Sequence, residues 1–367
     1  MLTVCVRSRL GSFQLDATLN AGSGVTALFG PSGSGKTSLI NMVAGLCRPD
    51  EGRIVIDDRV LFDAKAGIDV PPEQRRLGYV FQEPRLFPHL SVRSNLKFGW
   101  NRVSVAERTV DFAAVVEMLG IDHLLDRRPA GLSGGEKSRV AIGRALLASP
   151  RILLMDEPLA SLDSSRKAEV LPFVADLAKR FAIPILYVSH AMDEVLRLAD
   201  TLVLMAEGQI AAAGPTEEIL SRGDLCPLTG HGEVGTVLSA SVDHHDDENG
   251  VTALSFSGGT LLVGRIDSPP GAAVRLRIHA RDVALATEPP RQVSIRNILA
   301  VRIVSVTTTL DRQVEIKLDC GGAVIRSQIT ALAQSHLRLT PGMQAFALLE
   351  AVTVARGDIV DRPAGHR

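Results

Sequence analysis

The sequence of 367 residues lacks several features that define other classes of protein. Its four cysteines, Cys5, Cys47, Cys226 and Cys320, are far apart and form no C-x-x-C pair, which argues against a disulfide framework, a zinc ribbon or a redox pair. It has no run of about 18 apolar residues, and its first residues alternate rather than form a signal segment. We therefore expect reduced thiols in a chain that neither spans a membrane nor enters the secretory route.

The chain also lacks a strong net charge. Its 40 Lys and Arg residues and 41 Asp and Glu residues give a formal net charge of -1, so no global field recruits nucleic acid or an anionic membrane surface. We expect no nucleic-acid partner. The composition, 46% hydrophobic and 22% charged, is that of a folded protein, and at roughly 100 to 200 residues per domain the length predicts two or three domains.

Up to about residue 220, short β-branched runs alternate with longer helical stretches, which is typical of a parallel sheet covered by helices. We expect strands at Gly24–Phe29, Arg151–Met155 and Ile185–Ser189. These runs are apolar throughout, as strands buried on both faces are. Gly, Pro and polar residues then gather at Ser221–Gly232, which predicts a linker.

Beyond this linker the periodicity changes to two. Val274–His279 and Val314–Asp319 alternate strictly, which predicts half-buried antiparallel strands. A weak internal repeat predicts two small β-barrel lobes, although chance similarity of common turn dipeptides is an open alternative. The repeated dipeptides are Gly258-Gly259 with Gly321-Gly322, and Pro270-Gly271 with Pro341-Gly342. The tract Asp243–Gly250 could bind a metal, but a solvated hairpin loop is the favoured interpretation.

A glycine-rich segment, Gly30–Thr37, fits the pattern G-x-x-x-x-G-K-[ST] between a predicted strand and the helical stretch Ser38–Gly45. Glycines let backbone N–H groups turn toward phosphate oxygens. Lys36 would supply charge to the β- and γ-phosphates, and the Thr37 hydroxyl would bind Mg²⁺. The segment therefore predicts a phosphate-binding loop.

Two acidic residues, Asp156 and Glu157, end a predicted buried strand, where an open α/β sheet places its ligands. We expect Asp156 to hold Mg²⁺ and Glu157 to orient the attacking water, because phosphoryl transfer depends on positioning and charge stabilisation. Alone this pattern is weak, but together with the glycine-rich loop it is strong.

A second glycine segment precedes the helical stretch Lys137–Leu147. Ser133 and Glu136 have the spacing of a capping box, and Gly134 and Gly135 would expose backbone donors at the positive end of the helix. This segment is either a simple helix cap or an anion site.

These motifs, in this order, resemble those of the ATP-binding subunits of ABC transporters, over residues 1 to about 220. In that family two copies sandwich two ATP molecules, each between one copy's glycine-rich loop and the other copy's signature, here Ser133–Gly135. The resemblance implies that Phe13 stacks on adenine and that Gln82 touches Mg²⁺ and faces the transmembrane partner. It also implies that Ala160–Asp163 joins the two copies and that His190 contacts the γ-phosphate.

Some stretches are similar to one group within that family, the ATPases of molybdate importers. These are Arg75–Glu83 and Arg85–Val92 in the first part, and Ser294–Asn297, Leu318–Gly322 and Leu337–Gly342, which resemble an oxyanion-binding β module over about 290 to 355. The resemblance makes Ser294, Arg296 and Asn297 possible oxyanion ligands.

This chain departs from the module's pattern at Glu350, where a Lys is usual, and at Ala333, where a Ser is usual. A carboxylate repels an oxyanion. We therefore expect the β lobes to keep their shape while oxyanion binding is weakened or lost. A structural role, such as holding two subunits together, is an equally open alternative.

The expected fold is an α/β P-loop NTPase, the ABC ATPase cassette, followed by a small all-β OB-like barrel module. We expect the cassette at residues 1–229, a first β lobe at 230–288, a second, oxyanion-module-like lobe at 289–356 and a polar tail at 357–367.

The resemblance implies a homodimeric ATPase that uses ATP and Mg²⁺ at the cytoplasmic face of the inner membrane. It would drive permease subunits, to which an extracytoplasmic binding protein delivers the substrate. Molybdate is the expected substrate, with tungstate possible. A sulfate, iron(III) or sugar importer, a soluble ABC ATPase and an oxyanion sensor are the alternatives. The expected site residues are, for ATP, Phe13, Gly30, Pro31, Ser32, Gly33, Ser34, Gly35, Lys36, Thr37, Ser133, Gly134 and Gly135; for Mg²⁺, Thr37, Gln82 and Asp156; and for catalysis, Glu157, His190 and Gln82.

Overall fold

The computed structural model describes residues 1–220, 222, 225, 228, 235–308, 313–351 and 359–362. The chain divides into two compact units, Met1–Pro215 and Thr216–Arg367. Most of the predicted linker Ser221–Gly232 and most of the predicted tail 357–367 lie outside the described residues, so the predicted domain boundaries stay predictions. Within the described parts of the chain, no helix has the length and apolar character needed to cross a membrane.

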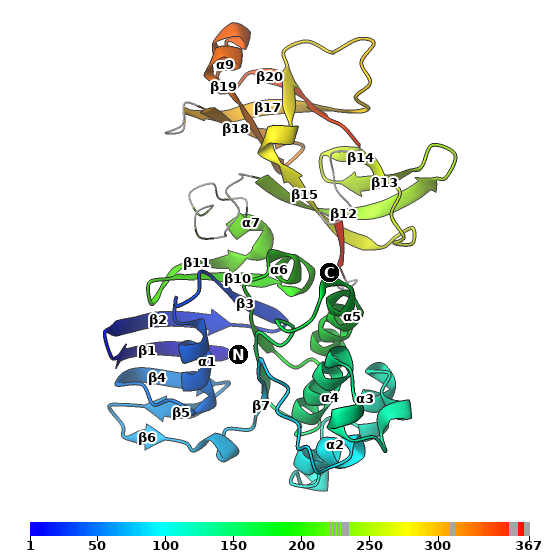
Figure 1. Cartoon of the computed structure of the whole chain (residues 1–367). Coiled ribbons are helices and arrows are strands. Elements are labelled where there is room, and N and C mark those ends of the chain that lie inside the picture. The colour runs from blue at the N-terminus through cyan, green and yellow to red at the C-terminus, as the bar shows by residue number, and fades with distance from the viewer. Residues whose placement is uncertain are drawn as a thin grey trace. The chain divides into compact units, whose positions relative to one another are not determined.

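The N-terminal unit is built on one 11-stranded sheet in the order β6-β5-β4-β1-β2-β11-β10-β3-β9-β8-β7. Figure 1 labels these strands, all except β8 and β9. Its strands are β1 (Leu2–Leu10), β2 (Phe13–Ala21), β3 (Val25–Phe29), β4 (Glu51–Ile56), β5 (Arg59–Asp63), β6 (Ile68–Asp69), β7 (Leu77–Val80), β8 (Ile152–Asp156), β9 (Ile185–Val188), β10 (Thr201–Ala206) and β11 (Gln209–Pro215).

Five neighbouring strands, β10, β3, β9, β8 and β7, run parallel to one another. The three predicted apolar strands are thereby confirmed as β3, β8 and β9, and every residue of these strands is buried. Their side chains alternate between two cores: Ile152 and Leu154 join the core that contains α1, while Leu153 and Met155 join the core of the helices on the opposite face. Burial on both faces explains the uninterrupted apolar pattern.

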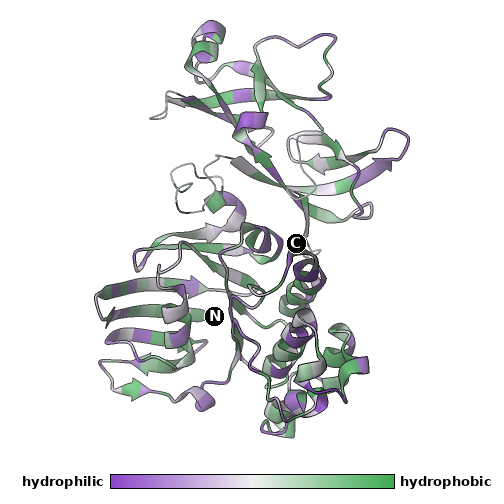
Figure 2. Ribbon diagram, in the orientation of Figure 1, coloured by the Kyte–Doolittle hydropathy of each residue, from purple (hydrophilic) through white to green (hydrophobic). Residues whose placement is uncertain are grey.

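Four helices of this unit begin at positions capped by a side chain. Side chains of Ser91, Asp111, Ser133 and Asp163 accept backbone N–H groups at the starts of α2, α3, α4 and α5. Along α4 and α5, Figure 2 shows hydrophobic and hydrophilic residues interleaved, as expected of helices with one buried face. The helices are α1 (Lys36–Ala44), α2 (Val92–Trp100), α3 (Phe112–Met118), α4 (Gly134–Leu146), α5 (Ser164–Arg180) and α6 (Met192–Leu198), with short 3-10 turns at Pro72–Gln74, Val105–Glu107, Asp122–Leu124 and Pro129–Gly131.

The described residues of the C-terminal unit form two five-stranded antiparallel sheets, β14-β13-β12-β15-β21 and β16-β20-β17-β18-β19. Both sheets contribute to one hydrophobic core, so the two predicted lobes share their interior. The elements are α7 (Thr216–Leu220), β12 (Gly235–Asp246), β13 (Val251–Phe256), β14 (Gly259–Gly264), β15 (Ala273–His279), a 3-10 turn at Ala280–Asp282, β16 (Ala284–Ala286), β17 (Asn297–Thr308), β18 (Gln313–Cys320), β19 (Ala323–Thr330), α9 (Ala331–Leu337), β20 (Gln344–Leu349) and β21 (Ile359–Arg362).

The internal repeat predicted from sequence is present in the structure. In each half a long strand, β12 or β17, has one bulge and pairs with the next strand and with the fourth strand of the same half. The Gly-Gly turns, between β13 and β14 and between β18 and β19, meet each other: a Cβ on Gly258 would lie 2.5 Å from the carbonyl oxygen of Cys320. The two halves also share an equivalent backbone hydrogen bond of 2.7 Å: the N–H of Gly271 donates to the carbonyl oxygen of Val242, and the N–H of Gly342 donates to that of Ile303.

The fifth strand of each sheet comes from the other half. β16 follows β15 along the chain but pairs with β20, whereas β21 follows β20 and pairs with β15. The two halves therefore exchange strands and are not independent lobes.

The predicted hairpin around Asp243–Gly250 is confirmed. β12 ends at Asp246 and β13 begins at Val251, and the two strands pair. Over the described residues, no group of three or more His, Cys, Asp or Glu side chains is arranged to hold a metal ion.

Candidate functional site

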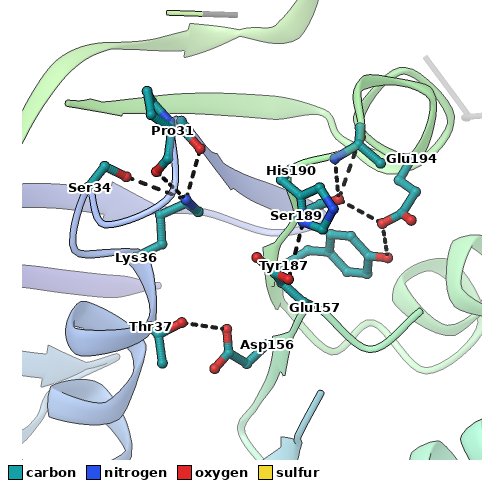
Figure 3. Close-up of polar contacts among 12 residues, drawn as sticks. Pro31, Ser34, Lys36, Thr37, Asp156, Glu157, Tyr187, Ser189, His190 and Glu194 are labelled. Carbon is teal, nitrogen blue, oxygen red and sulfur yellow. Dashed lines mark hydrogen bonds and ion pairs between the residues drawn. The ribbon is translucent and has the colours of Figure 1, made fainter. Parts of the chain in front are cut away.

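The glycine-rich loop between β3 and α1 folds around the amino group of Lys36. Lys36 Nζ donates to the carbonyl oxygens of Gly30 at 2.8 Å and Pro31 at 2.9 Å (Figure 3). Gly30 has φ +153°, and a Cβ there would collide with the carbonyl oxygen of Met205 on β10, so only glycine fits. The loop thus places a cation at the start of α1, where phosphates bind in P-loop proteins.

Lys36 is only 6% exposed. Burial lowers its pKa, and the charges of Glu157 and Asp156 oppose that shift. The bound phosphates of a nucleotide would add negative charge next to this amine and favour its charged form.

Thr37 and Asp156 come together where β8 ends beside α1. The Thr37 hydroxyl donates to Asp156 Oδ1 at 3.1 Å (Figure 3). Asp156 is 8% exposed, and burial raises its pKa against the opposing hydrogen bonds from Thr37 and Tyr79. A hydroxyl and a carboxylate so arranged offer two oxygen ligands.

Gln82 lies with these two residues on the wall of one cavity of about 630 Å³. Mg²⁺ takes oxygen ligands, keeps several waters and is usually bound by one or two carboxylates together with substrate phosphates. The oxygen donors of Thr37, Asp156 and Gln82 fit that ion. The structure therefore brings the three predicted Mg²⁺ residues to one cavity.

Sequence reasoning missed Tyr79, which lines the same cavity. Its hydroxyl donates to Asn41 Oδ1 at 2.9 Å and lies 3.4 Å from Asp156 Oδ2. Burial, followed by the charge of Asp156, raises its pKa far above the usual value, so the phenol stays protonated as a donor. No local sequence signal marks it, because its place follows from the strand order: β7 runs parallel to β8, so both strands end at the same edge of the sheet.

Glu157 and His190 face each other at the ends of β8 and β9. His190 Nδ1 lies 3.1 Å from Glu157 Oε2 (Figure 3). Glu157 adopts φ +46°, a conformation rare for a residue with a side chain, and its N–H donates to the carbonyl oxygen of Val188. Such backbone strain clusters at functional sites. The pair can hold a water molecule and contact a terminal phosphate.

Phe13, the first residue of β2, lies beside the glycine-rich loop. A Cβ on Gly35 would lie 3.2 Å from its ring. The half-buried Phe13 ring therefore lies beside the glycine-rich loop, where its aromatic face is available for stacking.

The signature segment begins α4 with a complete capping box. Ser133 Oγ accepts from Glu136 N at 3.3 Å, and the Glu136 carboxylate accepts from Ser133 N at 2.6 Å. This second bond lowers the pKa of Glu136. The predicted helix cap is thus confirmed, and Ser133 keeps a hydroxyl proton that can be donated to an anion.

In the C-terminal unit, the three possible oxyanion residues differ in their surroundings. Ser294 and Arg296 are exposed, and Ser294 Oγ lies 3.4 Å from Glu350 Oε1. Asn297 is buried, and both polar atoms of its side chain bond the backbone of Leu262. Ala333 donates its N–H to Thr330 at the start of α9. The role of these residues as oxyanion ligands stays a prediction.

The comparisons with known proteins agree with one another. The chain matches the ABC transporter family over residues 13–160 and the TOBE domain over residues 293–355. It is 64% identical to the molybdenum import ATP-binding protein ModC of Paramagnetospirillum magneticum, over 98% of this chain and 99% of the relative. It is 58% identical to ModC of Rhodospirillum rubrum over the same shares. A solved ATP-binding cassette of an ABC transporter, MJ1267 in its ADP conformation, superposes with a TM-score of 0.53 at 29% identity, over 62% of this chain and 97% of that one.

Proposed function

The chain belongs to the ABC transporter family, in the group of the molybdenum import ATP-binding proteins, and on that basis we propose that it hydrolyses ATP to power molybdate import. The observation that carries the proposal is the convergence of Lys36, Thr37, Asp156, Glu157 and His190 at the carboxyl ends of β3, β8 and β9. A sulfate, iron(III) or sugar importer is disfavoured, because relatives at 47% to 64% identity over nearly the whole chain are named for molybdenum.

Each residue of the site has a distinct part in the proposed reaction. The loop at Gly30–Gly35 and Lys36 bind the phosphates, and the Phe13 ring stacks on adenine. Glu157 orients the attacking water, and His190, held against Glu157, contacts the γ-phosphate. Thr37, Asp156 and Gln82 would hold Mg²⁺, which offsets the charge that develops on the phosphates.

The signature residues act in a second copy of the chain. The described hydrogen bonds of Ser133, one through its hydroxyl and one through its backbone N–H, are made with Glu136 of its own helix. Its hydroxyl and the backbone of Gly134 and Gly135 would receive the γ-phosphate held by the partner's loop. The working unit in this proposal is a homodimer with two shared ATP sites, which closes on ATP and opens after hydrolysis.

The dimer would act through membrane partners. The proposed partners are permease subunits, contacted near Gln82 and Phe87–His89, with an extracytoplasmic binding protein that delivers the substrate. The chain would then be a peripheral protein at the cytoplasmic face of the inner membrane. Choice of the oxyanion would belong to the permease and binding protein, which leaves tungstate as a second substrate.

Replacing Glu157 by Gln tests the mechanism. The variant should bind ATP as the parent does and lose about 10²- to 10⁴-fold in hydrolysis, because a positioned base contributes that much. Glu117→Gln, which removes an exposed carboxylate on α3, is the control and should keep full activity. Undiminished hydrolysis by Glu157→Gln would refute the assigned role.

Uptake by cells tests the transport function. Cells whose own copy of this chain carries Glu157→Gln should take up less molybdate than parental cells, while sulfate uptake is unchanged. Equal molybdate uptake, or loss of sulfate uptake alone, would contradict the proposal.

A further inference from the structure

One buried acidic residue, Glu194, has no part in the reaction described above. It lies in the first turn of α6, and its side chain is 3% exposed. Its Oε1 is 2.8 Å from Lys167 Nζ, and its Oε2 accepts from Tyr187 at 2.9 Å and Ser189 at 2.7 Å. Figure 3 shows Glu194, Tyr187 and Ser189 next to His190. Three donors, one from α5 and two from the end of β9, therefore meet on one carboxylate.

This cluster connects two of the loops that carry the proposed function. On one side, Ser189 precedes His190, and the Ser189 hydroxyl also accepts the N–H of Ala191 at 3.0 Å, so the backbone on both sides of His190 is tied to Glu194. On the other side, Lys167 lies in the first turn of α5, where its N–H donates to the carbonyl oxygen of Asp163, the residue that caps the helix.

Stability alone does not account for such a pair. Taking two charges out of water costs free energy that their attraction offsets only with good geometry, so a buried ion pair is weak evidence of stabilisation. Fixing one arrangement of the elements that it joins is a better-supported use of buried polar groups. Here those elements are the strand end before His190, the start of α6 and the start of α5.

We infer that Lys167 and Glu194 are positioning residues for hydrolysis. The pair fixes the backbone at His190 relative to Ala160–Asp163, so that contact between two copies at that loop sets the distance between His190 and Glu157. This inference rests on the proposed homodimeric ATPase. The pair lies outside the phosphate-binding residues, so its loss should slow the chemical step and leave nucleotide binding intact.

The first test is kinetic and uses the full chain with Mg-ATP. Lys167→Met and Glu194→Gln should each lower kcat about tenfold or more, with KM for ATP and the affinity for a fluorescent ATP analogue within twofold of the parent. Lys167→Arg, which keeps the positive charge, should recover at least half of the parental kcat. Glu315→Gln breaks a similarly buried ion pair with Arg326 in the C-terminal unit and should change neither constant.

Melting temperatures separate positioning from folding. If Glu194→Gln does not fold, Lys167→Met decides, because Lys167 is at the more exposed end of the pair, with 17% of its side chain accessible. A folded Lys167→Met variant with parental kcat would overturn the inference, as would a KM that rises while kcat stays constant.

A second readout does not depend on ATP hydrolysis. NMR of the nine histidine rings, with His190→Gln to assign the signal of His190, should show that signal shifted in Lys167→Met and unshifted in Glu315→Gln. If the parent hydrolyses no ATP, the proposed function fails, and the NMR result alone decides on the pair. An unshifted His190 signal in Lys167→Met would refute the positioning role.

Discussion

Replacing Asn297 by Ala should destabilise the C-terminal unit. Asn297 begins β17 and is 3% exposed. Its Oδ1 accepts the N–H of Leu262 at 2.6 Å, and its Nδ2 donates to the carbonyl oxygen of the same residue at 2.8 Å. The side chain thus clamps β14 of one half to β17 of the other. Alanine at this position removes the side-chain hydrogen bonds to the backbone N–H and the carbonyl oxygen of Leu262.

The size of the effect follows from these two bonds. A buried polar group left without a partner costs about 1–3 kcal/mol. Leu262 is half-buried, so we take the lower part of that range and expect a total loss of about 2–4 kcal/mol. For a unit of this size each kcal/mol lowers the melting temperature by roughly 2–4 °C, which gives a shift of about 5–15 °C.

Differential scanning calorimetry of the full chain measures this shift in the transition of the C-terminal unit. Ser294→Ala is the matched control, because Ser294 is exposed, and it should change the stability by less than about 0.5 kcal/mol. Asn297→Asp should also destabilise, since one carboxylate oxygen then faces the carbonyl oxygen of Leu262. A melting temperature of Asn297→Ala within about 1 °C of the parent would refute the clamp.

Three further outcomes are expected. Burial raises the pKa of Asp156 above its ordinary value of 3.8, so the stability that its protonated form contributes is lost as pH rises through the raised pKa. In urea unfolding with a chelator present, Asp156→Asn should therefore be more stable than the parent at pH 7 and should lose this advantage near pH 3. The variant should also lack Mg²⁺-dependent hydrolysis. A less stable variant at pH 7 would contradict this. Arg75→Met should lower the free energy of unfolding by about 3–5 kcal/mol in the same urea assay, because the 1% exposed guanidinium donates to Asp69 and to carbonyl oxygens at the end of α1. Arg48→Met, at the exposed arginine that also faces Asp69, should lower it by less than about 0.5 kcal/mol. Equal effects of the two substitutions would refute this difference. Calorimetric titration of molybdate, with sulfate as control, should show no tight selective binding to the parent, since the Glu350 carboxylate lies beside Ser294, and stronger binding to Glu350→Lys; tight binding to the parent would disprove the expectation.

The local parts of the site could be predicted from the sequence. The glycine-rich loop with Lys36 and Thr37, and the capping box of Ser133, depend on residues a few positions apart, so the chain itself sets their geometry. Asp156 and Glu157 were found because a buried parallel strand must place its last residues at the ligand-binding edge.

The parts that the sequence did not reveal depend on strand order. Tyr79 reaches Asp156 because β7 lies beside β8, although α2, α3 and α4 separate these strands along the chain. The contact of Lys167 with Glu194 similarly requires α5 and α6 to pack together. The period-two pattern located β15 and β18, but the short strands β16 and β21 carry no signal of which sheet they join, since pairing partners are not encoded in alternation.

The exchange of strands between the halves has a consequence for how the protein is made. During synthesis, β12 to β15 leave the ribosome first, yet Leu276 on β15 cannot find its partner Ile359 until the whole second half has followed. Until then β15 presents an open edge to other nascent chains, and such edges promote aggregation. The C-terminal unit should therefore complete its folding only after β21 has emerged, and its yield should depend on expression rate and temperature more than that of the N-terminal unit.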